Sequence, residues 1–370
     1  MRPLEGLRVL DFTTLLPGPM ATLILAEAGA EVLKIERPGG GDEMRSYVPR
    51  LGADSVNFAL LNRGKRSLAI DLKAPGGKER LMPLVAVADV LVEQFRPGVM
   101  DRLGLGYDAL RGVNPRLVYC AITGYGQAGP RAMVAGHDLN YLADTGMLAL
   151  SAGSDGAPVL PPALIADIAG GAYPAVINIL LALQQRAVSN EGCRLDVSMS
   201  DNLFPFLYWA MGNGVAAGQW PKPGGELVTG GSPRYQIYRT ADDRFVAAAP
   251  LEQKFWETFC DAIGLAAAYR DDASDPNATR AAVAARIRAH PAAEWRARFA
   301  GKDLCATIAV SVEEAMRDPH FAARGLFAWG VIAGGARIPA VPVPVAPEFR
   351  AAPGDAPAPP LGEANATVLR

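Results

Sequence analysis

The chain has 370 residues, half of them hydrophobic, and its 36 Lys plus Arg nearly balance its 38 Asp plus Glu. A sequence of this length exceeds one ordinary hydrophobic core, so we expect two domains. The formal net charge is −2 and the pI is about 6.0, which favours neither a nucleic acid nor an anionic membrane as a partner.

The four cysteines are scattered along the chain without a C-x-x-C spacing. This pattern predicts small buried side chains in a reducing compartment, not disulfides or metal ligands, for Cys120, Cys193, Cys260 and Cys305. The sequence shows no signal-peptide pattern and, by inspection, no apolar run long enough to span a bilayer. We therefore expect a cytoplasmic enzyme that needs no metal.

The first part of the chain alternates predicted strands and helices. Residues 7–12 predict a strand, a Pro-Gly-Pro turn leads into a helix to about residue 28, and residues 31–36 predict the next strand. The alternation continues with a basic turn and strand at 62–73, a helix at 76–87, and strands at 89–95 and 117–123. Such βαβ units predict an α/β fold with a parallel sheet.

Two arginines directly follow predicted strands. Arg37 comes after the strand at 31–36, and Arg96 comes after the strand at 89–95. Ligands of open α/β sheets gather beyond the carboxyl ends of the strands. Together with Arg63, Lys65 and Lys73, these arginines could surround a polyphosphate, although each alone would be an ordinary surface charge.

A glycine pattern follows the strand at 117–123. The segment from Gly124 to Gly129 formally matches the dinucleotide fingerprint G-x-G-x-x-G. That fingerprint requires a helix to begin at the glycines, but Pro130 follows and no strand precedes His137. We interpret the segment as a mobile loop beside the predicted helix that starts at His137.

Two proton-transfer groups stand at the beginnings of predicted helices. His137 precedes an apolar periodic run through residues 141–147, and Asp167 precedes another at 172–183. An aspartate at such a position is usually a cap, and a single histidine is more often structural than catalytic. The two together predict an acid/base pair that can face one cavity.

The second half of the chain changes in style. A Gly/Pro-rich stretch predicts a linker, and then come a hairpin at 235–250, an amphipathic helix starting at Glu252, helices at 279–300, a strand at 305–312 and a short helix at 312–317. A Pro/Ala-rich tail from Glu348 is expected to lie loosely along a surface. The predicted organisation is a large domain at 1–216, a linker at 217–234, a small α+β domain at 235–325, and a return linker and tail at 326–370 that pack on the large domain or a partner chain.

Several motifs occur in one order along residues 4–265: LRVLDFTTLLPGP, GAEVLKIERPGGGD, NRGKRSLAIDLK, EQFRPGVMDRLGLGYDAL, TGYGQAGP, GHDLNYLADTG and YQIYRTADDRFVAAAPLEQKFW. With these motifs the chain resembles the family III CoA-transferases, and among them most of all the 2-methylacyl-CoA racemases. The resemblance implies a Rossmann-like large domain, a smaller domain, and a homodimer of two chains interlocked as rings. It also implies an acyl-CoA substrate bound across the rim of the sheet, with no cofactor beyond the CoA of that substrate.

The resemblance further assigns roles to matching positions. Arg37 and Arg96 match the family's arginines near the CoA phosphates, and the pair Leu72-Lys73 matches the edge of its adenine site.

The catalytic positions follow in the same way. His137, Asp167 and Glu252 match the racemase acid/base set. Inverting a carbon next to a thioester requires removing a proton from one face and returning one to the other, which His137 and Asp167 could share. Glu252 would orient the imidazole of His137, and backbone N–H groups at a helix start near Asp167 would meet the enolate oxygen.

Other reactions remain open at this point. The same Asp167 could attack a thioester and form a mixed anhydride, as in the family's transferases, where His137 and Glu252 have no obvious use. A non-enzymatic acyl-CoA binding protein and a nicotinamide dehydrogenase are the further alternatives. The GHD motif favours the racemase.

Overall fold

The structure is a computed structural model that describes residues 2–153 and 155–368, and the chain divides into two compact units. Unit 1 takes the residues up to 145, then 161–206 and 319 onward, whereas unit 2 takes 146–160 and 207–318. The sequence-based division drew one continuous large domain to residue 216. The structure instead groups residues 146–160 and 207–216 with unit 2, so the chain crosses between the two units four times.

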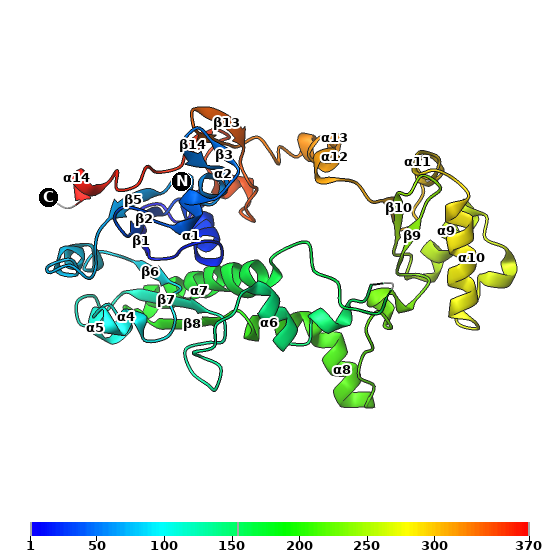
Figure 1. Ribbon diagram of the computed structural model, residues 1–370, viewed down its shortest axis with the longest axis horizontal. Coiled ribbons are helices and arrows are strands. Elements are labelled where there is room, and N and C mark those ends of the chain that lie inside the picture. Colours follow the sequence, from blue (N-terminus) through cyan, green and yellow to red (C-terminus); the bar gives the residue numbers. More distant parts are fainter. Residues whose placement is uncertain (1, 154, 369–370) are drawn as a thin grey trace. The chain divides into compact units, whose positions relative to one another are not determined.

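Unit 1 is built on a six-stranded sheet whose strands run in the order β5-β2-β1-β6-β7-β8, with all neighbours parallel (Figure 1). The strands are β1 (Arg8–Asp11), β2 (Glu31–Glu36), β5 (Arg66–Ala69), β6 (Val90–Glu93), β7 (Val118–Thr123) and β8 (Arg194–Ser198). Counted within the sheet, this order is 3-2-1-4-5-6, the Rossmann arrangement. The prediction of an α/β fold with a parallel sheet is therefore confirmed.

Helices cover both faces of this sheet. On one face lie α1 (Pro17–Glu27) and α7 (Tyr173–Ser189), which contact each other and the strands beneath them. On the other, a buried apolar cluster joins the sheet to η2 (Glu79–Leu81), α3 (Met82–Val85), α4 (Val99–Arg102) and α5 (Tyr107–Arg111). The single helix predicted at 76–87 is only a 3-10 turn and one α-helical turn, because Pro83 lacks the N–H that a continuous helix needs.

The expectation that no apolar run is long enough to span a bilayer is wrong for one helical segment. The continuous helical segment Ala166–Ser189 has a mean hydropathy of 1.5 and is long and apolar enough by length and composition alone. In the structure its inward side chains, such as Ala175 and Ile179, are buried in unit 1, where α7 packs on α1, β7 and β8. A helix that packs on a sheet inside a protein can have the same length and composition. These two properties are therefore only weak evidence that the segment spans a membrane.

Unit 1 has further elements besides the sheet and the helices that cover it. They include η1 (Glu43–Ser46), the short hairpin β3 (Arg50–Leu51) and β4 (Asp54–Ser55), α2 (Val56–Asn62), α6 (Asp138–Asp144), the π-helical turn η4 (Ala166–Ala172), α13 (Pro319–Ala323), η8 (Pro347–Phe349) and α14 (Asn365–Val368). The 3-10 segment η5 (Asp201–Leu207) leads out of the unit.

The C-terminal region is more ordered than the sequence suggested. Strands β12 (Gly330–Ala333), β13 (Ala336–Pro339) and β14 (Asp355–Pro357) form a three-stranded sheet, and Val331 and Ala333 pack on α2 with Ala59. The tail from Glu348 was expected to lie loosely along a surface. This expectation is wrong for Asp355–Pro357, which pairs in parallel with β12.

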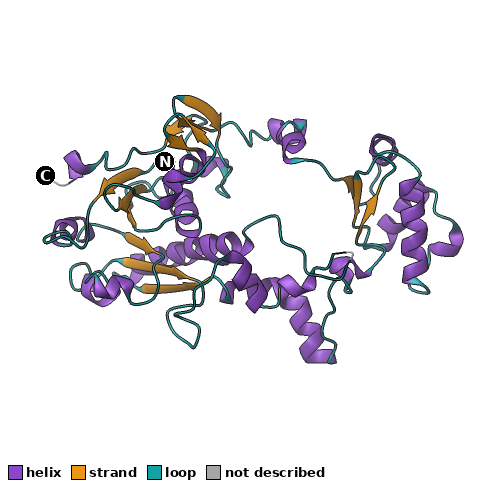
Figure 2. Ribbon diagram, in the orientation of Figure 1, coloured by secondary structure: helices purple, strands orange, loops and turns teal. Residues whose placement is uncertain are grey.

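Unit 2 contains an antiparallel sheet of three strands, in the order β11-β10-β9, with helices packed against it (Figure 2). Its elements are η3 (Leu148–Leu150), α8 (Tyr208–Ala217), η6 (Leu227–Gly231), β9 (Gln236–Arg239), β10 (Phe245–Ala248), α9 (Gln253–Ile263), η7 (Ala267–Tyr269), α10 (Pro276–Arg288), α11 (Ala292–Phe299), β11 (Ala306–Ile308) and α12 (Val312–Met316). Its core centres on Trp256, Phe259 and Trp295, all fully buried. This unit has the α+β character that the hairpin and helix patterns predicted.

All four cysteines are free thiols. Cys120 and Cys260 are buried, as predicted, whereas Cys193 is half-buried and Cys305 is exposed. The prediction of four buried side chains is thus wrong for Cys305, which lies at the surface of unit 2 just before β11.

Candidate active site

A cavity of about 410 Å³ opens where the chain leaves β1, β6 and β7 at their carboxyl ends. The strand order reverses between β1 and β6, and this reversal is where open α/β sheets bind their ligands. The cavity is lined by Arg96, His137 and Asp167. Unit 1 therefore brings together Arg96 and the predicted pair of His137 and Asp167.

His137 is the N-cap residue of α6 and is exposed to solvent. Its backbone N–H donates to Oδ1 of Asn140 at 3.0 Å, which fixes the start of the helix. The next turn is anchored by Tyr141, whose hydroxyl donates to the carbonyl of Gly136 at 2.6 Å. The imidazole therefore projects from a rigid helix start and not from a mobile loop.

The glycines that suggested a dinucleotide fingerprint have a different use. No helix begins at Gly124 to Gly129, and the next helix is α6 at Asp138. A Cβ atom on Gly124 would lie 2.5 Å from the ring of Tyr141, and one on Gly136 would lie 2.8 Å from it. These two glycines make room for Tyr141, which supports the start of α6. The segment is therefore not a dinucleotide-binding loop, as predicted.

Asp167 lies in the π-helical turn η4 directly before α7. Such π-helical turns are rare and are frequently found at functional sites. Its backbone N–H donates to Oδ1 of Asp138, the first residue of α6, at 2.9 Å. Asp138 is 5% exposed, so a buried carboxylate ties the two helix starts together.

The environment of Asp167 changes its acidity. Burial, together with the negative charge of Asp138, raises the pKa of this carboxyl to about 6, against an opposing effect of the nearby His137. A carboxyl with this pKa exists in both protonation states near neutral pH. A carboxyl of this kind is suited to giving or taking a proton.

The segment that carries Asp167 is seated by close packing. Gly170 lies against the backbone carbonyl of Met199, and a Cβ on Gly171 would lie 3.2 Å from Cβ of Pro17. The side-chain amide of Asn202 donates to the carbonyl of Gly170 at 2.9 Å. Only glycine fits where η4 approaches the end of β8 and the start of α1 so closely.

The amide of Asp167 does not serve the enolate oxygen in this structure, because Asp138 already accepts its N–H. Among the first amides of α6, the N–H of Asn140 donates to the carbonyl of His137 at 2.8 Å.

A second cavity, of about 680 Å³, adjoins the first through Phe95, which lines both. It is lined by Arg37, Leu72 and Lys73, the residues predicted to hold CoA. Arg96 was expected beside Arg37 but lines the first cavity with His137. The two predicted phosphate ligands thus stand in adjoining cavities.

Two residues of these cavities were missed in the sequence. Arg102, on α4, adds a third cationic side chain to the second cavity. Its position in the sequence, one helical turn beyond Gly98, could have indicated that it lies near Arg96 and Arg37. Thr123, at the end of β7, lines the first cavity, and its buried hydroxyl has no hydrogen-bond partner among the described residues. A buried hydroxyl of this kind leaves no trace in sequence.

Two of the basic residues assigned to the rim are not there. Arg63 and Lys65 are 2% and 5% exposed. Arg63 pairs with Glu27 at 2.8 Å, and Lys65 pairs with Asp11 at 3.1 Å inside unit 1. The expectation that they help to bind a polyphosphate is wrong, because their charges are already neutralised in the core.

Glu252, the third predicted catalytic residue, belongs to unit 2. It is the exposed N-cap residue of α9 and begins the helix as its position in the sequence predicted. Its backbone carbonyl accepts the N–H groups of Phe255 and Trp256 at 3.0 Å each.

The Rossmann-type sheet, with His137 and Asp167 in a cavity at its switch point and a cationic cavity beside it, is the arrangement of an α/β enzyme. The sequence model of CoA-transferase family III matches residues 4–365, and the chain belongs to this family. It is 36% identical to a mouse (Mus musculus) protein named alpha-methylacyl-CoA racemase, over 99% of this chain and 92% of that protein.

Transferases are as similar. The chain is 35% identical to the acetyl-CoA:oxalate CoA-transferase of Acetobacter aceti, over 93% of this chain and 89% of that protein. Among solved structures, a CAIB/BAIF family protein from Brucella suis matches with a TM-score of 0.83 and 29% identity, over 99% of this chain and 98% of that one. The family is therefore established, and both reactions occur among its similar members.

Proposed function

We propose that this enzyme epimerises the α-carbon of a 2-methylacyl-CoA by two-base proton transfer between His137 and Asp167. The observation that supports this proposal most is that both side chains line one cavity, with a pKa of about 6 for Asp167. One group would remove the α-proton from one face, and the other would return a proton to the opposite face. A single base cannot easily serve both faces of the carbon.

The remaining residues would bind and polarise the thioester. Arg37, Lys73 and Arg102 would meet the phosphates of CoA, with Leu72 at the edge of the adenine site. The amides at the start of α6 would donate to the enolate oxygen, helped by the helix dipole. Glu252 would orient the imidazole of His137, a role that a Glu252→Gln variant tests through the pH dependence of turnover.

We also propose that the functional form is a homodimer of interlocked chains. In unit 1, α7 exposes a row of large apolar side chains: Tyr173, Ile177, Leu180 and Leu181. A row of this kind on a water-soluble protein favours a protein partner. Interlocked subunits should stay dimeric on nanomolar dilution and should not exchange with differently tagged dimers; a folded monomer in light scattering would contradict the proposal.

A second reaction has its own support. Transferase relatives are as similar as the racemases, and Asp167 alone could form an acyl anhydride. In that reaction CoA leaves and is recaptured by a second acid, and His137 has no evident task.

One experiment separates the two reactions. The enzyme is incubated with a (2R)-2-methylacyl-CoA in deuterated water, with and without a free carboxylic acid as acceptor. We expect deuterium at the α-carbon and racemisation in both cases. Transfer of CoA to the acceptor without α-deuterium would establish the transferase instead.

A further inference from the structure

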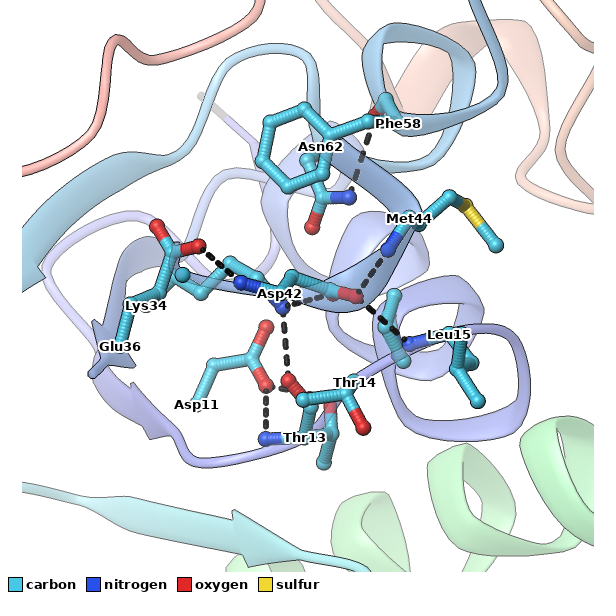
Figure 3. A network of polar contacts seen from close by, with 12 residues as sticks. Asp11, Thr13, Thr14, Leu15, Lys34, Glu36, Asp42, Met44, Phe58 and Asn62 are labelled. Carbon is cyan, nitrogen blue, oxygen red and sulfur yellow. Dashed lines mark hydrogen bonds and ion pairs between the residues drawn. The ribbon is translucent and has the colours of Figure 1, made fainter. Parts of the chain in front are cut away.

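The loop that joins β1 to α1, residues 13–16, is held by a buried ion pair (Figure 3). Lys34 and Asp42 lie 3.0 Å apart, and neither side chain is exposed to solvent. The ammonium of Lys34 donates to the carbonyl of Thr13 at 2.7 Å, and Oδ1 of Asp42 accepts the N–H of Leu15 at 3.2 Å. Both members of the pair thus bind the backbone of this loop.

The loop needs such support because of its conformation. Leu15 has a φ of +60°, in the left-handed region that leucine rarely adopts. This conformation is unfavourable for a residue with a Cβ and persists only where surrounding contacts impose it. The hydrogen bond from the Leu15 N–H to Asp42 acts directly on the strained residue.

The far side of the loop is fixed from β6. The side-chain amide of Gln94 donates to the carbonyl of Thr14 at 2.6 Å, and its oxygen accepts the N–H of Gly18 at 3.1 Å. Close packing of Gly18 against the side chain of Thr13 completes the turn. The loop is therefore bound from both neighbouring strands, β2 and β6.

The held loop forms part of the active site. Leu15 and Pro17 line the cavity that contains His137 and Asp167. Pro17 also packs against Gly171, four residues beyond Asp167 in the same helical segment. A shift of the loop would alter both the wall of the cavity and the seat of Asp167.

A buried ion pair needs an explanation beyond stability. Moving two charges out of water is costly, and replacing such pairs with uncharged residues of similar size is often neutral for folding. The Lys34–Asp42 pair does, however, satisfy two backbone groups of a strained loop. These contacts indicate that the pair holds the loop at residues 13–16 in its conformation.

We propose that the Lys34–Asp42 pair is a positioning device of the active site, which keeps Leu15 left-handed and so fixes the wall of the cavity beside His137 and Asp167. This inference deepens the function proposed above and rests on it for its kinetic consequence. Neither Lys34 nor Asp42 lines the cavity proposed for CoA, so loss of the pair should chiefly misplace the reacting carbon. The effect therefore falls on the chemical step, where small misplacements are costly.

The test is the double variant Lys34→Met/Asp42→Asn, which removes both charges and leaves no unpaired one in the core. With a 2-methylacyl-CoA we expect kcat to fall roughly 10–100-fold while KM changes less than about 3-fold. Because asparagine tolerates the left-handed region, the same double change should cost less in a Leu15→Asn background. An equal loss in both backgrounds would overturn the proposal.

A matched control removes another ion pair of unit 1. Arg186, near the end of α7, lies 2.8 Å from Asp89, which directly precedes β6 and so lies at the amino end of that strand, away from the cavity. The double variant Arg186→Met/Asp89→Asn should leave kcat within about 2-fold. If it lowers kcat as much as the Lys34–Asp42 change, the effect is one of general stability and the proposal is wrong.

A readout without substrate separates this proposal from the proposed function. Hydrogen–deuterium exchange of a peptide covering residues 13–18 should speed up about 10-fold or more in the Lys34→Met/Asp42→Asn variant, since the Leu15 N–H loses its charged acceptor. Faster exchange with no racemase activity in the wild type would reject the reaction but keep the positioning role. Unchanged exchange would reject the positioning role itself.

Discussion

The Asp138 carboxylate accepts the backbone N–H of Asp167 at 2.9 Å and so joins the start of α6 to the start of the helix that carries the second acid/base group. The same contact brings a second negative charge close to the Asp167 carboxyl, which helps to raise its pKa to about 6. One buried side chain thus helps to fix the position and to raise the pKa of the carboxyl that we propose as a proton carrier.

Replacing Asp138 with asparagine separates these two effects. Asp138→Asn keeps an oxygen that can accept the Asp167 N–H but removes the charge, so the pKa of Asp167 should fall from about 6. We expect the acidic limb of the kcat/KM profile to move to lower pH by a fraction of a unit to one unit, since burial persists. A limb that stays in place, in a correctly folded variant, would mean that Asp138 acts only through its hydrogen bond.

Asp167 should also make the protein less stable as pH rises. Its pKa is about 6 in the folded state against an ordinary value of 3.8, so between these values the folded state binds more protons than the unfolded state. Stability therefore falls as pH increases from about 4 to about 6. Asp167→Asn removes this effect and should stabilise the protein by up to ~3 kcal/mol at pH 7.

The check is denaturant unfolding of both proteins at pH 4.5 and pH 7.5. The advantage of Asp167→Asn should be small at the lower pH and larger at the higher one. A variant that is less stable than the wild type at pH 7.5 would show that ionised Asp167 is stabilised by contacts that outweigh its burial.

The sequence predicted the groups whose role depends on their place along the chain. Arg37, His137 and Asp167 were found because each stands where a predicted strand or helix begins or ends. Lys65 was assigned to the rim because a lysine in a basic turn looks exposed; its partner Asp11 is 54 residues away, and only the folded chain shows them together.

The strands of the C-terminal region were missed for a related reason. The segment Gly330–Pro339 contains the turn Gly334-Gly335 between two short strands, but alanine, proline and glycine are depleted in strands. Packing of Val331 and Ala333 on α2 forms these strands despite their weak local preference. Tertiary contacts of this kind are not visible in a local pattern.

The two arginines that the sequence assigned to CoA, Arg37 and Arg96, should behave differently when removed. Arg37 lines the outer cavity, so Arg37→Ala should raise KM about 10-fold with kcat nearly unchanged, because a remote phosphate contact acts on ground and transition states alike. Arg96 lines the cavity of His137 and Asp167, so Arg96→Ala should lower kcat as well. Steady-state kinetics with one acyl-CoA decides this, and identical profiles for both variants would contradict the separate placement.

Two glycine-to-alanine changes test the seat of Asp167. Gly170 lies against the carbonyl of Met199, so Gly170→Ala should destabilise the protein by ~1–3 kcal/mol and reduce activity. Gly212, in the middle of α8, has open space around it, and Gly212→Ala should be neutral or stabilising by up to ~1 kcal/mol. Thermal unfolding measures both, and a harmless Gly170→Ala would mean that the π-helical turn can move without cost.

The two leading reactions differ in what they need from His137 and Asp167. In a two-base racemase each residue carries one proton, so His137→Ala and Asp167→Ala should each slow epimerisation by ~10²–10⁴-fold in both directions. Proton exchange on the face served by the remaining group could persist in each variant. In a transferase the pattern is unequal, because Asp167→Ala removes the nucleophile whereas His137→Ala only disturbs the cavity.

A chemical trap provides the matching control. Hydroxylamine or borohydride should capture an acyl-aspartate on a transferase and nothing on a racemase, since only the former passes through an anhydride. We expect comparable losses at both residues and no adduct on the wild-type protein, with Asp167→Ala still folded because its burial is unfavourable to the charged form. An adduct on Asp167 together with a nearly active His137→Ala enzyme would assign the chain to the transferases, because the histidine would then carry no proton in turnover.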